Sequence, residues 1–281
     1  MMTSGASIEE LLREALRDRY AVDREIARGG MATVYLAQGV REGQPVAIKV
    51  MHPRLAAVVG AARFLREIAV VRSMDHPLIV PLRDSGEAGG MLYYVMPYVE
   101  GETLHERLHR EGRLTLEDAL RITNDVATAL AYAHRHGVLH RDVKPENILL
   151  AGGHALIADF GLARAIGAEC TRLTRTGVIV GTVYYMSPEQ LREDPDLDQR
   201  VDVYSLGCIL YEMLTGAPPY TGGSLRELAT RILRAPVPSA RLQRPEVPDP
   251  IDQAVTRALA KPAAARFASM EEFAAALAAP R

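Results

Sequence analysis

The sequence predicts an α+β protein of two lobes, the first rich in strands and the second mainly helical. Up to about residue 96, short apolar segments alternate with Gly and Pro signals, as in a sheet. After Gly101, apolar residues recur at helical spacing instead. The length of 281 residues also suits two lobes, since a domain takes about 150 residues.

A short helix is expected before the first strand. Ser7 begins a capping-box pattern with Glu10 at the third helical position, and apolar residues follow at helical spacing through Leu16. Segments 20–26, 34–38, 46–51 and 92–96 are predicted to be strands. Between them, residues 63–74 fit a helix, whose apolar face would hold Phe64, Ile68 and Val71.

Helices dominate the second lobe. Thr115 and Asp118 begin one helix, and residues 203–214 are apolar enough for a buried one. Residues 225–233 repeat apolar side chains at helical spacing, and Ser269 with Glu272 forms a second capping-box pattern. The five prolines from Pro236 to Pro250 predict an irregular connection.

Composition excludes several classes of function. The chain has 33 basic and 35 acidic residues, a net charge of −2, so no bulk positive field attracts nucleic acid. We expect no membrane segment in this chain, because no apolar run reaches the ~18 residues that a span requires. Two cysteines, Cys170 and Cys208, are too few for a disulfide framework and indicate a reducing compartment.

The strongest chemical signal is the segment HRDVKPEN at residues 140–147. Asp159-Phe160-Gly161 follows it, VAIK at residues 46–49 precedes it, and Glu67 lies on the helix expected after VAIK. Ser187-Pro188-Glu189 completes the series. The conjunction of these motifs in this order is far more specific than any one of them, and it is typical of protein kinases.

On these motifs the chain resembles the bacterial, eukaryotic-like (Hanks-type) Ser/Thr protein kinases, from about Arg19 to Leu277. The resemblance implies the two-lobed protein kinase fold, with an antiparallel β-sheet and one main helix in the N-lobe and a mainly helical C-lobe. Residues 1–18 would form an N-terminal helical extension, residues 19–96 the N-lobe, and residues 97–281 the hinge and C-lobe.

The resemblance also implies catalytic roles that suit each side chain. Lys49 would neutralise the α- and β-phosphates of ATP, and Glu67 would hold Lys49 in place. Asp142 would accept the proton of the substrate hydroxyl, and Lys144 would neutralise the γ-phosphate. The oxygen ligands of Asn147 and Asp159 suit Mg²⁺. The residues expected to surround adenine are Val34, Ala47, Met96, Pro97, Val99 and Leu149.

The nucleotide loop departs from the family pattern G-x-G-x-x-G-x-V. The pattern falls on residues 27–34, and its phosphate-binding members would be Ala27, Arg28, Gly29, Gly30, Met31, Ala32 and Val34. Alanine replaces both outer glycines, at Ala27 and Ala32. If either position requires a positive φ, alanine there costs about 1 kcal/mol. We therefore expect glycine at both positions to improve the use of ATP.

Regulation is expected in the activation segment, residues 162–186. The resemblance points to autophosphorylation at Thr174 or Thr176, with Arg141 binding the phosphate. It also places Thr182 near the catalytic loop, residues 140–147. Glu189 is expected to pair with Arg266. The stack of side chains that links the lobes in active kinases would comprise Val71, Leu82, His140 and Phe160, with Asp202 as its anchor.

The expected function is Mg²⁺-dependent transfer of the ATP γ-phosphate to Ser or Thr of protein substrates, with a homodimer serving trans-autophosphorylation. A pseudokinase scaffold is the alternative that Ala27 and Ala32 motivate, and a small-molecule phosphotransferase is a third hypothesis. A metal site at His134, His136 and His140 is a further hypothesis, but residues two apart on a helix face different sides, so helix-end and catalytic-loop roles explain these histidines better. The acidic residues Glu193, Asp194, Asp196 and Asp198 are expected to form a solvated loop, with docking of a basic partner as the alternative. We expect a cytoplasmic location, or the cytoplasmic domain of a longer membrane receptor.

Overall fold

The computed structural model describes residues 7–30, 32–53, 56, 60–160 and 181–278, of which 181 and 182 only by their backbone. These residues divide into two compact units. One runs through Met74 and includes Val80–Val99. The other holds Asp75–Ile79 and the chain from Glu100 onward. The chain passes from the first unit to the second after Val99, three residues beyond the boundary expected from the sequence.

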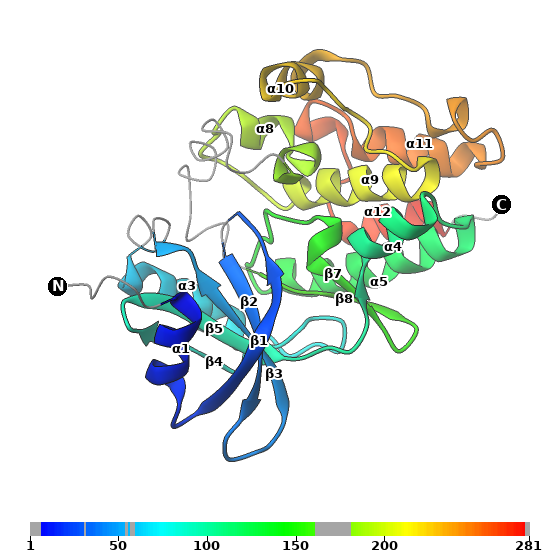
Figure 1. The fold of residues 1–281 in the computed structure, drawn as a ribbon. Coiled ribbons are helices and arrows are strands. Elements are labelled where there is room, and N and C mark those ends of the chain that lie inside the picture. The colour runs from blue at the N-terminus through cyan, green and yellow to red at the C-terminus, as the bar shows by residue number, and fades with distance from the viewer. Residues whose placement is uncertain (1–6, 31, 54–55, 57–59, 161–180, 279–281) are drawn as a thin grey trace. The chain divides into compact units, whose positions relative to one another are not determined.

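The first unit is built on an antiparallel five-stranded sheet in the order β1-β2-β3-β5-β4 (Figure 1). Its strands are β1 (Tyr20–Arg28), β2 (Ala32–Gly39), β3 (Pro45–Met51), β4 (Asp84–Ala88) and β5 (Met91–Pro97). The sequence indicated four of them. It missed β4, whose residues DSGEA lack the β-branched and aromatic side chains that favour strands.

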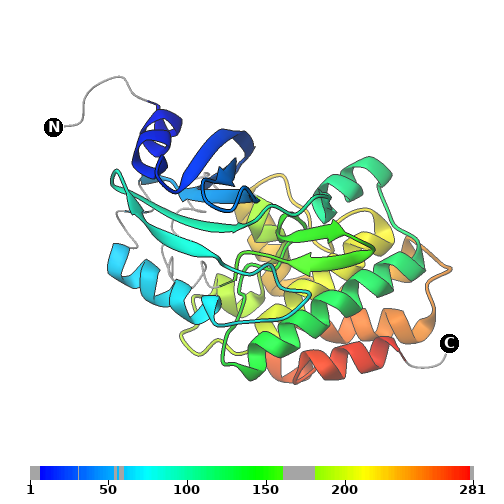
Figure 2. The ribbon, with the colours of Figure 1, turned by 90° about the horizontal axis from the view of Figure 1, so that it is seen from below.

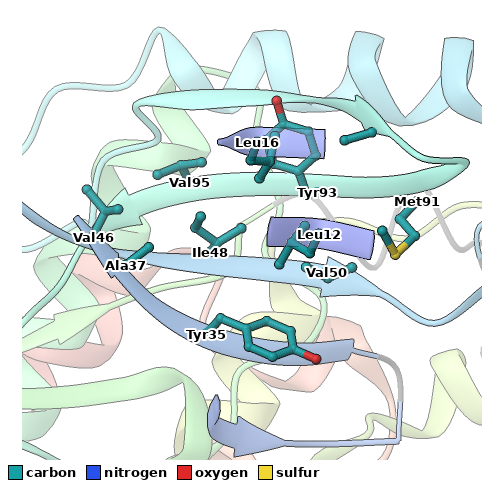
Figure 3. Close-up of a cluster of buried hydrophobic side chains, with 11 residues drawn as sticks. Leu12, Leu16, Tyr35, Ala37, Val46, Ile48, Val50, Met91, Tyr93 and Val95 are labelled. Carbon is teal, nitrogen blue, oxygen red and sulfur yellow. The ribbon is translucent and has the colours of Figure 1, made fainter. Parts of the chain in front are cut away.

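Helix α1 (Ile8–Leu16) covers one face of this sheet. The predicted capping box forms: Glu10 N donates to Ser7 Oγ at 3.2 Å, and Ser7 N donates to the Glu10 carboxylate at 2.7 Å. Leu12 and Leu16 are at most 1% exposed and pack on alternate side chains of β2, β3 and β5, which Figure 3 shows: Tyr35, Ala37, Val46, Ile48, Val50, Met91, Tyr93 and Val95. We call this the α1 face of the sheet. The helix is therefore part of the core of this unit.

The opposite face of the sheet carries the residues expected to bind nucleotide. Helix α3 (Ala61–Arg72) lies on this side, across the sheet from α1 (Figure 2). It buries Phe64, Ile68 and Val71, as the helical spacing predicted. Because side chains alternate along a strand, every second residue of β2, β3 and β5 points to this side.

The second unit is mainly helical and also contains a small antiparallel sheet in the order β6-β7-β8. The sheet comprises β6 (Glu102–Thr103), β7 (Ile148–Ala151) and β8 (His154–Ile157). The helices are α4 (Leu104–Glu111), α5 (Leu116–Arg135), α8 (Pro188–Leu191), α9 (Arg200–Thr215), α10 (Leu225–Arg234), α11 (Asp249–Ala258) and α12 (Met270–Leu277). Short 3₁₀ turns are η1 (Pro145–Asn147), η2 (Gly181–Tyr185), η3 (Ala240–Leu242) and η4 (Ala263–Ala265).

Helix α9 lies at the centre of this unit, packed between α5 and α11 (Figure 1). Thirteen of its residues are buried, including Asp202 and Ser205, so its polar side chains need partners within the protein. The capping box predicted at Ser269 forms only in part. Glu272 N donates to Ser269 Oγ, but the Glu272 carboxylate accepts from Ala268 N and not from Ser269 N.

Candidate active site

Asp202 of α9 holds the backbone of the catalytic loop. It is fully buried and accepts hydrogen bonds from His140 N at 2.9 Å and from Arg141 N at 2.8 Å. His134 Nε2 lies 2.7 Å from the same carboxylate. Burial opposes ionisation, but the hydrogen bond and charge of His134, together with the contacts of His140, lower the pKa of Asp202 below its usual range.

Two residues of the loop region have left-handed backbones. Arg141 has a φ of 65° and Asp159 a φ of 70°, a conformation that costs a non-glycine residue about 1–3 kcal/mol unless its surroundings impose it. Those surroundings are visible at Arg141: its N–H binds Asp202, and its carbonyl accepts from Gln190 Nε2 at 2.8 Å. The fold therefore imposes the backbone direction just before Asp142.

His140 links the two functional segments. Its Nε2 lies 2.9 Å from the carbonyl of Ala158, which can only accept, so this nitrogen carries the proton. The other nitrogen, Nδ1, then accepts from Asp142 N at 3.2 Å. The Phe160 ring meets the imidazole edge-on, with 4.6 Å between centroids. One buried side chain thus positions both Asp142 and the segment that carries Asp159.

The carboxylate of Asp142 has two unequal oxygens. Oδ2 accepts from Lys144 Nζ at 2.8 Å and from Asn147 Nδ2 at 3.3 Å. Oδ1 is buried and has no hydrogen-bond partner within the described residues. Burial favours neutral Lys144, but the Asp142 carboxylate outweighs it and raises the lysine pKa, so Lys144 remains charged. The arrangement fixes one oxygen of Asp142 and leaves the other available as a hydrogen-bond acceptor.

Asn147 and Asp159 have the chemistry of a hard-cation site. Asn147 Nδ2 donates to the Asp142 carbonyl at 2.9 Å, which leaves Oδ1 as the acceptor atom of the amide. Ala158 N donates to the Asn147 carbonyl at 2.9 Å and so joins the two segments just before Asp159. Carboxylate and amide oxygens of this kind suit Mg²⁺. Leu149 is half-buried on β7, opposite Thr103.

In the first unit, strand register groups the predicted nucleotide residues. Val34 lies opposite Lys49, and Ala47 lies opposite Met96. All four are on the face of the sheet away from α1, and all but the buried Ala47 are half-buried. Glu67, also half-buried, lies three residues after Phe64 and four before Val71, on the buried side of α3. Pro97 ends β5, and Val99 is the last residue of the unit.

The nucleotide loop does not need the positive φ that its missing glycines suggested. Ala27 of β1 pairs with Val34 of β2, and Ala32 of β2 pairs with Met51 of β3. Neither alanine is among the described residues with positive φ. The expectation of a conformational penalty at these positions is therefore wrong for this structure, and this removes the backbone-strain argument for the pseudokinase hypothesis. Arg28, Gly29 and Gly30 are exposed, and Met31 lies outside the described residues.

Glu189 and Arg266 form the expected pair. The two guanidinium nitrogens of Arg266 contact the two carboxylate oxygens of Glu189 at 2.5 and 2.8 Å. Arg266 also donates to the carbonyls of Ala260, Arg200 and Lys261. The buried guanidinium thus has acceptors for each of its three nitrogens, in addition to the charge of Glu189. The pair ties α8 to the connection between η4 and α12.

Several expectations fall where the structure gives no description. Thr174 and Thr176 lie outside the described residues, as does Gly161, and Thr182 is described only by its backbone in η2. Val71 is buried and Leu82 half-buried, both in the first unit. Over the described residues, no helix has the length and apolar character needed to cross a membrane.

Sequence reasoning missed the residues that support the loop from a distance. Gln190 binds the Arg141 carbonyl, and the Tyr185 hydroxyl donates to Glu212 of α9 at 2.6 Å. His134 and His136 were considered above as metal ligands, but they contact the Asp202 carboxylate and the Tyr132 carbonyl instead, at 2.7 and 2.8 Å. No short motif marks these residues, because their partners are distant in sequence or ordinary backbone groups.

Comparison with known proteins agrees with this geometry. Residues 20–273 match the family model described as the protein kinase domain. The chain is 41% identical over 264 residues to the serine/threonine-protein kinase PknB of Mycobacterium tuberculosis, covering 92% of this chain and 42% of that protein. A probable serine/threonine-protein kinase of Streptomyces coelicolor is 40% identical over 263 residues, covering 92% of this chain and 39% of that protein. The chain thus spans less than half the length of these relatives.

Solved structures show the same fold. The kinase domain of M. tuberculosis PknI superposes with a TM-score of 0.73 at 33% identity, covering 92% of this chain and 94% of that one. The complex of Rad53 with AMP-PNP has a TM-score of 0.76 at 27% identity, covering 92% of this chain and 65% of that one. The family match, the order of the motifs and the anchored loop around Asp142 lead to one conclusion: the chain belongs to the protein kinase family.

Proposed function

We propose that this chain is the catalytic domain of a Ser/Thr protein kinase that transfers the γ-phosphate of ATP to protein hydroxyls. The observation that carries this proposal is the state of Asp142. Lys144 and Asn147 hold one carboxylate oxygen, and the other is buried without a partner among the described residues. A carboxylate in this state orients a hydroxyl and takes its proton.

The steps assigned to the chain's own residues follow from charge. The substrate hydroxyl binds Asp142 Oδ1, which accepts its proton as the hydroxyl oxygen forms a bond to the γ-phosphorus. The bond from that phosphorus to the bridging oxygen of the β-phosphate breaks, and ADP leaves. Lys144 lies 2.8 Å from Asp142 and, being cationic, stabilises negative charge that develops on the γ-phosphoryl oxygens. Lys49 supplies the positive charge for the α- and β-phosphates, and Glu67 orients Lys49. Phosphoryl transfer depends mainly on such positioning and charge neutralisation.

The residues assigned to adenine and to Mg²⁺ are those that the family resemblance indicated. Val34, Ala47 and Met96 offer an apolar surface to the base, and the carbonyl of Pro97 and the backbone groups of Val99 offer hydrogen bonds. The family resemblance assigns Leu149 a further apolar contact with the base. Asn147 and Asp159 would hold Mg²⁺, which neutralises phosphate charge when bound. The side-chain amide of Asn147 supports this assignment. Its nitrogen donates to the Asp142 carbonyl, so its oxygen is the atom that can bind a cation.

Two substitutions test the catalytic assignment. Asp142→Asn removes the proton acceptor and a negative charge, and loss of general-base catalysis alone costs about 10²–10⁴-fold in rate. Lys49→Met removes phosphate neutralisation. Steady-state phosphotransfer to a protein substrate should collapse in both variants, while Arg17→Met, which removes a cation whose side chain is 66% exposed, serves as the control. Near-wild-type kcat in either test variant would refute the roles.

Activation by autophosphorylation belongs to the same proposal. A phosphate on Thr174 or Thr176 adds about −1.5 to −2 charges, which would order the segment against Arg141. Preincubation with ATP should therefore raise the activity of the wild type and of the control Thr171→Ala. The double variant Thr174→Ala, Thr176→Ala should lose this rise. If it retains the rise, these threonines are not the switch.

The remaining assignments concern context. We place the domain in the cytoplasm, where ATP is available and where the free, buried thiol of Cys208 is stable. Protein substrates are favoured over small molecules by the Thr-bearing segment before Ser187-Pro188-Glu189. Trans-autophosphorylation would require two copies to meet. Sedimentation of the chain with and without ATP tests for a homodimer.

A further inference from the structure

His52 is a histidine that the roles above do not use, yet it touches the nucleotide loop. It directly follows β3, and its Nε2 lies 2.9 Å from the Gly29 carbonyl oxygen. A carbonyl oxygen can only accept, so Nε2 carries the proton and donates. Both the neutral imidazole with this tautomer and the imidazolium have that N–H, so the hydrogen bond is open to either form.

Strand register explains why this contact can form. Ala32, the first residue of β2, pairs with Met51, the last residue of β3. His52 is therefore the first residue beyond the paired part of β2 and β3. The connection between β1 and β2, which contains Gly29, also begins beyond that last pair. The His52 carbonyl accepts from Ala56 N at 3.0 Å. This bond to Ala56 holds the backbone of His52, whose imidazole contacts the Gly29 carbonyl.

Gly29 is held at both of its backbone groups. Its N–H donates to the Ala32 carbonyl at 2.9 Å, within the turn, and its carbonyl accepts from His52, outside the turn. Gly29 and Gly30 give this segment many accessible backbone conformations, so ordering it for a ligand costs entropy. The hydrogen bond from His52 to the Gly29 carbonyl reduces the number of those conformations before any ligand binds.

We propose that His52 is a positioning residue for ATP binding. Its imidazole fixes the Gly29 peptide before nucleotide binds. The inference rests on the proposed function of the loop as the phosphate-binding segment. Preorganisation lowers the cost of binding and leaves the chemical step unchanged. The effect of losing it therefore falls on KM for ATP and on nucleotide affinity, with kcat retained.

The test compares three variants with the wild type. His52→Leu removes the donor, whereas His52→Gln keeps an amide N–H at similar reach. His109→Leu is the matched control, because His109 is an exposed histidine in the last turn of α4. We expect His52→Leu to raise KM for ATP about 3- to 10-fold, the range for one partly exposed hydrogen bond, and to change kcat less than about 2-fold. Gln should restore most of KM, and the control should match wild type.

A second measurement does not depend on turnover. Calorimetric titration with a non-hydrolysable ATP analogue should show the same loss of affinity in His52→Leu and its recovery in His52→Gln. The melting temperature of the ligand-free protein should stay within about 2 °C of wild type, since the contact is exposed. Unchanged affinity and KM in His52→Leu, equal impairment by Gln, or a larger fall in melting temperature would each overturn the proposal. An inactive wild type would refute the proposed kinase activity and leave this titration as the test of His52.

Discussion

Replacing Asp202 by Asn should destabilise the second unit by about 3–5 kcal/mol. The magnitude follows from the contacts of the carboxylate. Its Oδ1 accepts from Arg141 N and its Oδ2 from His140 N, at 2.8 and 2.9 Å. A hydrogen bond to a charged group contributes about 1.5–3 kcal/mol. His134 Nε2 also lies 2.7 Å from Oδ2. Asparagine retains one acceptor oxygen, which keeps the most contacts at the Oδ2 position, so the bond from Arg141 N is lost.

The amide group of the new residue adds a second cost. Its NH₂ would face a backbone N–H, which leaves a buried donor unsatisfied at about 1–3 kcal/mol. The left-handed backbone of Arg141 would lose one of its two supports and relax. Since Asp142 follows directly, its carboxylate would shift, and a misplacement near 1 Å costs about 100-fold in rate. We therefore expect kcat to fall by about that factor in molecules that remain folded.

Chemical denaturation followed by circular dichroism measures the free energy of unfolding. The control is Asp18→Asn, whose side chain is 93% exposed in the wild type, and which should stay within about 0.5 kcal/mol of wild type. The pKa of Asp202 is lowered on folding, so its stabilisation is present above the unfolded value of about 3.9 and is lost as pH falls through the folded pKa. The difference between wild type and Asp202→Asn should shrink in acid. A loss below about 1 kcal/mol at neutral pH would refute the argument.

Two further predictions concern the first unit. Leu12→Ala should reduce the free energy of unfolding by about 2–5 kcal/mol because Leu12 is fully buried on the α1 face; Leu11→Ala, at a site 40% exposed, is the control, and equal losses in chemical denaturation would contradict the packing assigned to α1. The double variant Ala27→Gly, Ala32→Gly should lose about 1 kcal/mol of stability, because glycine gives the unfolded chain more conformational freedom and neither alanine, both near strand ends, has a positive φ. ATP titration of this variant should show no gain in kcat/KM, and a severalfold gain would mean that the bound loop adopts another conformation.

Much of the secondary structure was determined by local sequence. The helices begin at Ser7, Thr115 and Ser269 as predicted, because a capping hydrogen bond spans only three residues. Strands β2, β3 and β5 were predicted from apolar segments bounded by turn residues, within two residues at each end. The short strands β6 and β7 and the polar β4 carried no such signal, and their formation depends on neighbouring strands that supply backbone partners.

The motif residues were likewise recognisable in the sequence, because their order and spacing are specific to the chemistry of phosphoryl transfer. Only the tertiary structure decided what holds them. Asp202 binds a backbone 62 residues earlier, and His52 binds a carbonyl 23 residues earlier. Neither partner is a side chain, so no residue type marks it. The same holds for the alanines of the nucleotide loop: the family pattern suggested strain, and the φ angles that removed this expectation are set by pairing with β2 and β3. Sequence encodes which groups are present, but a backbone hydrogen bond across the fold forms only after the chain has brought two distant segments together.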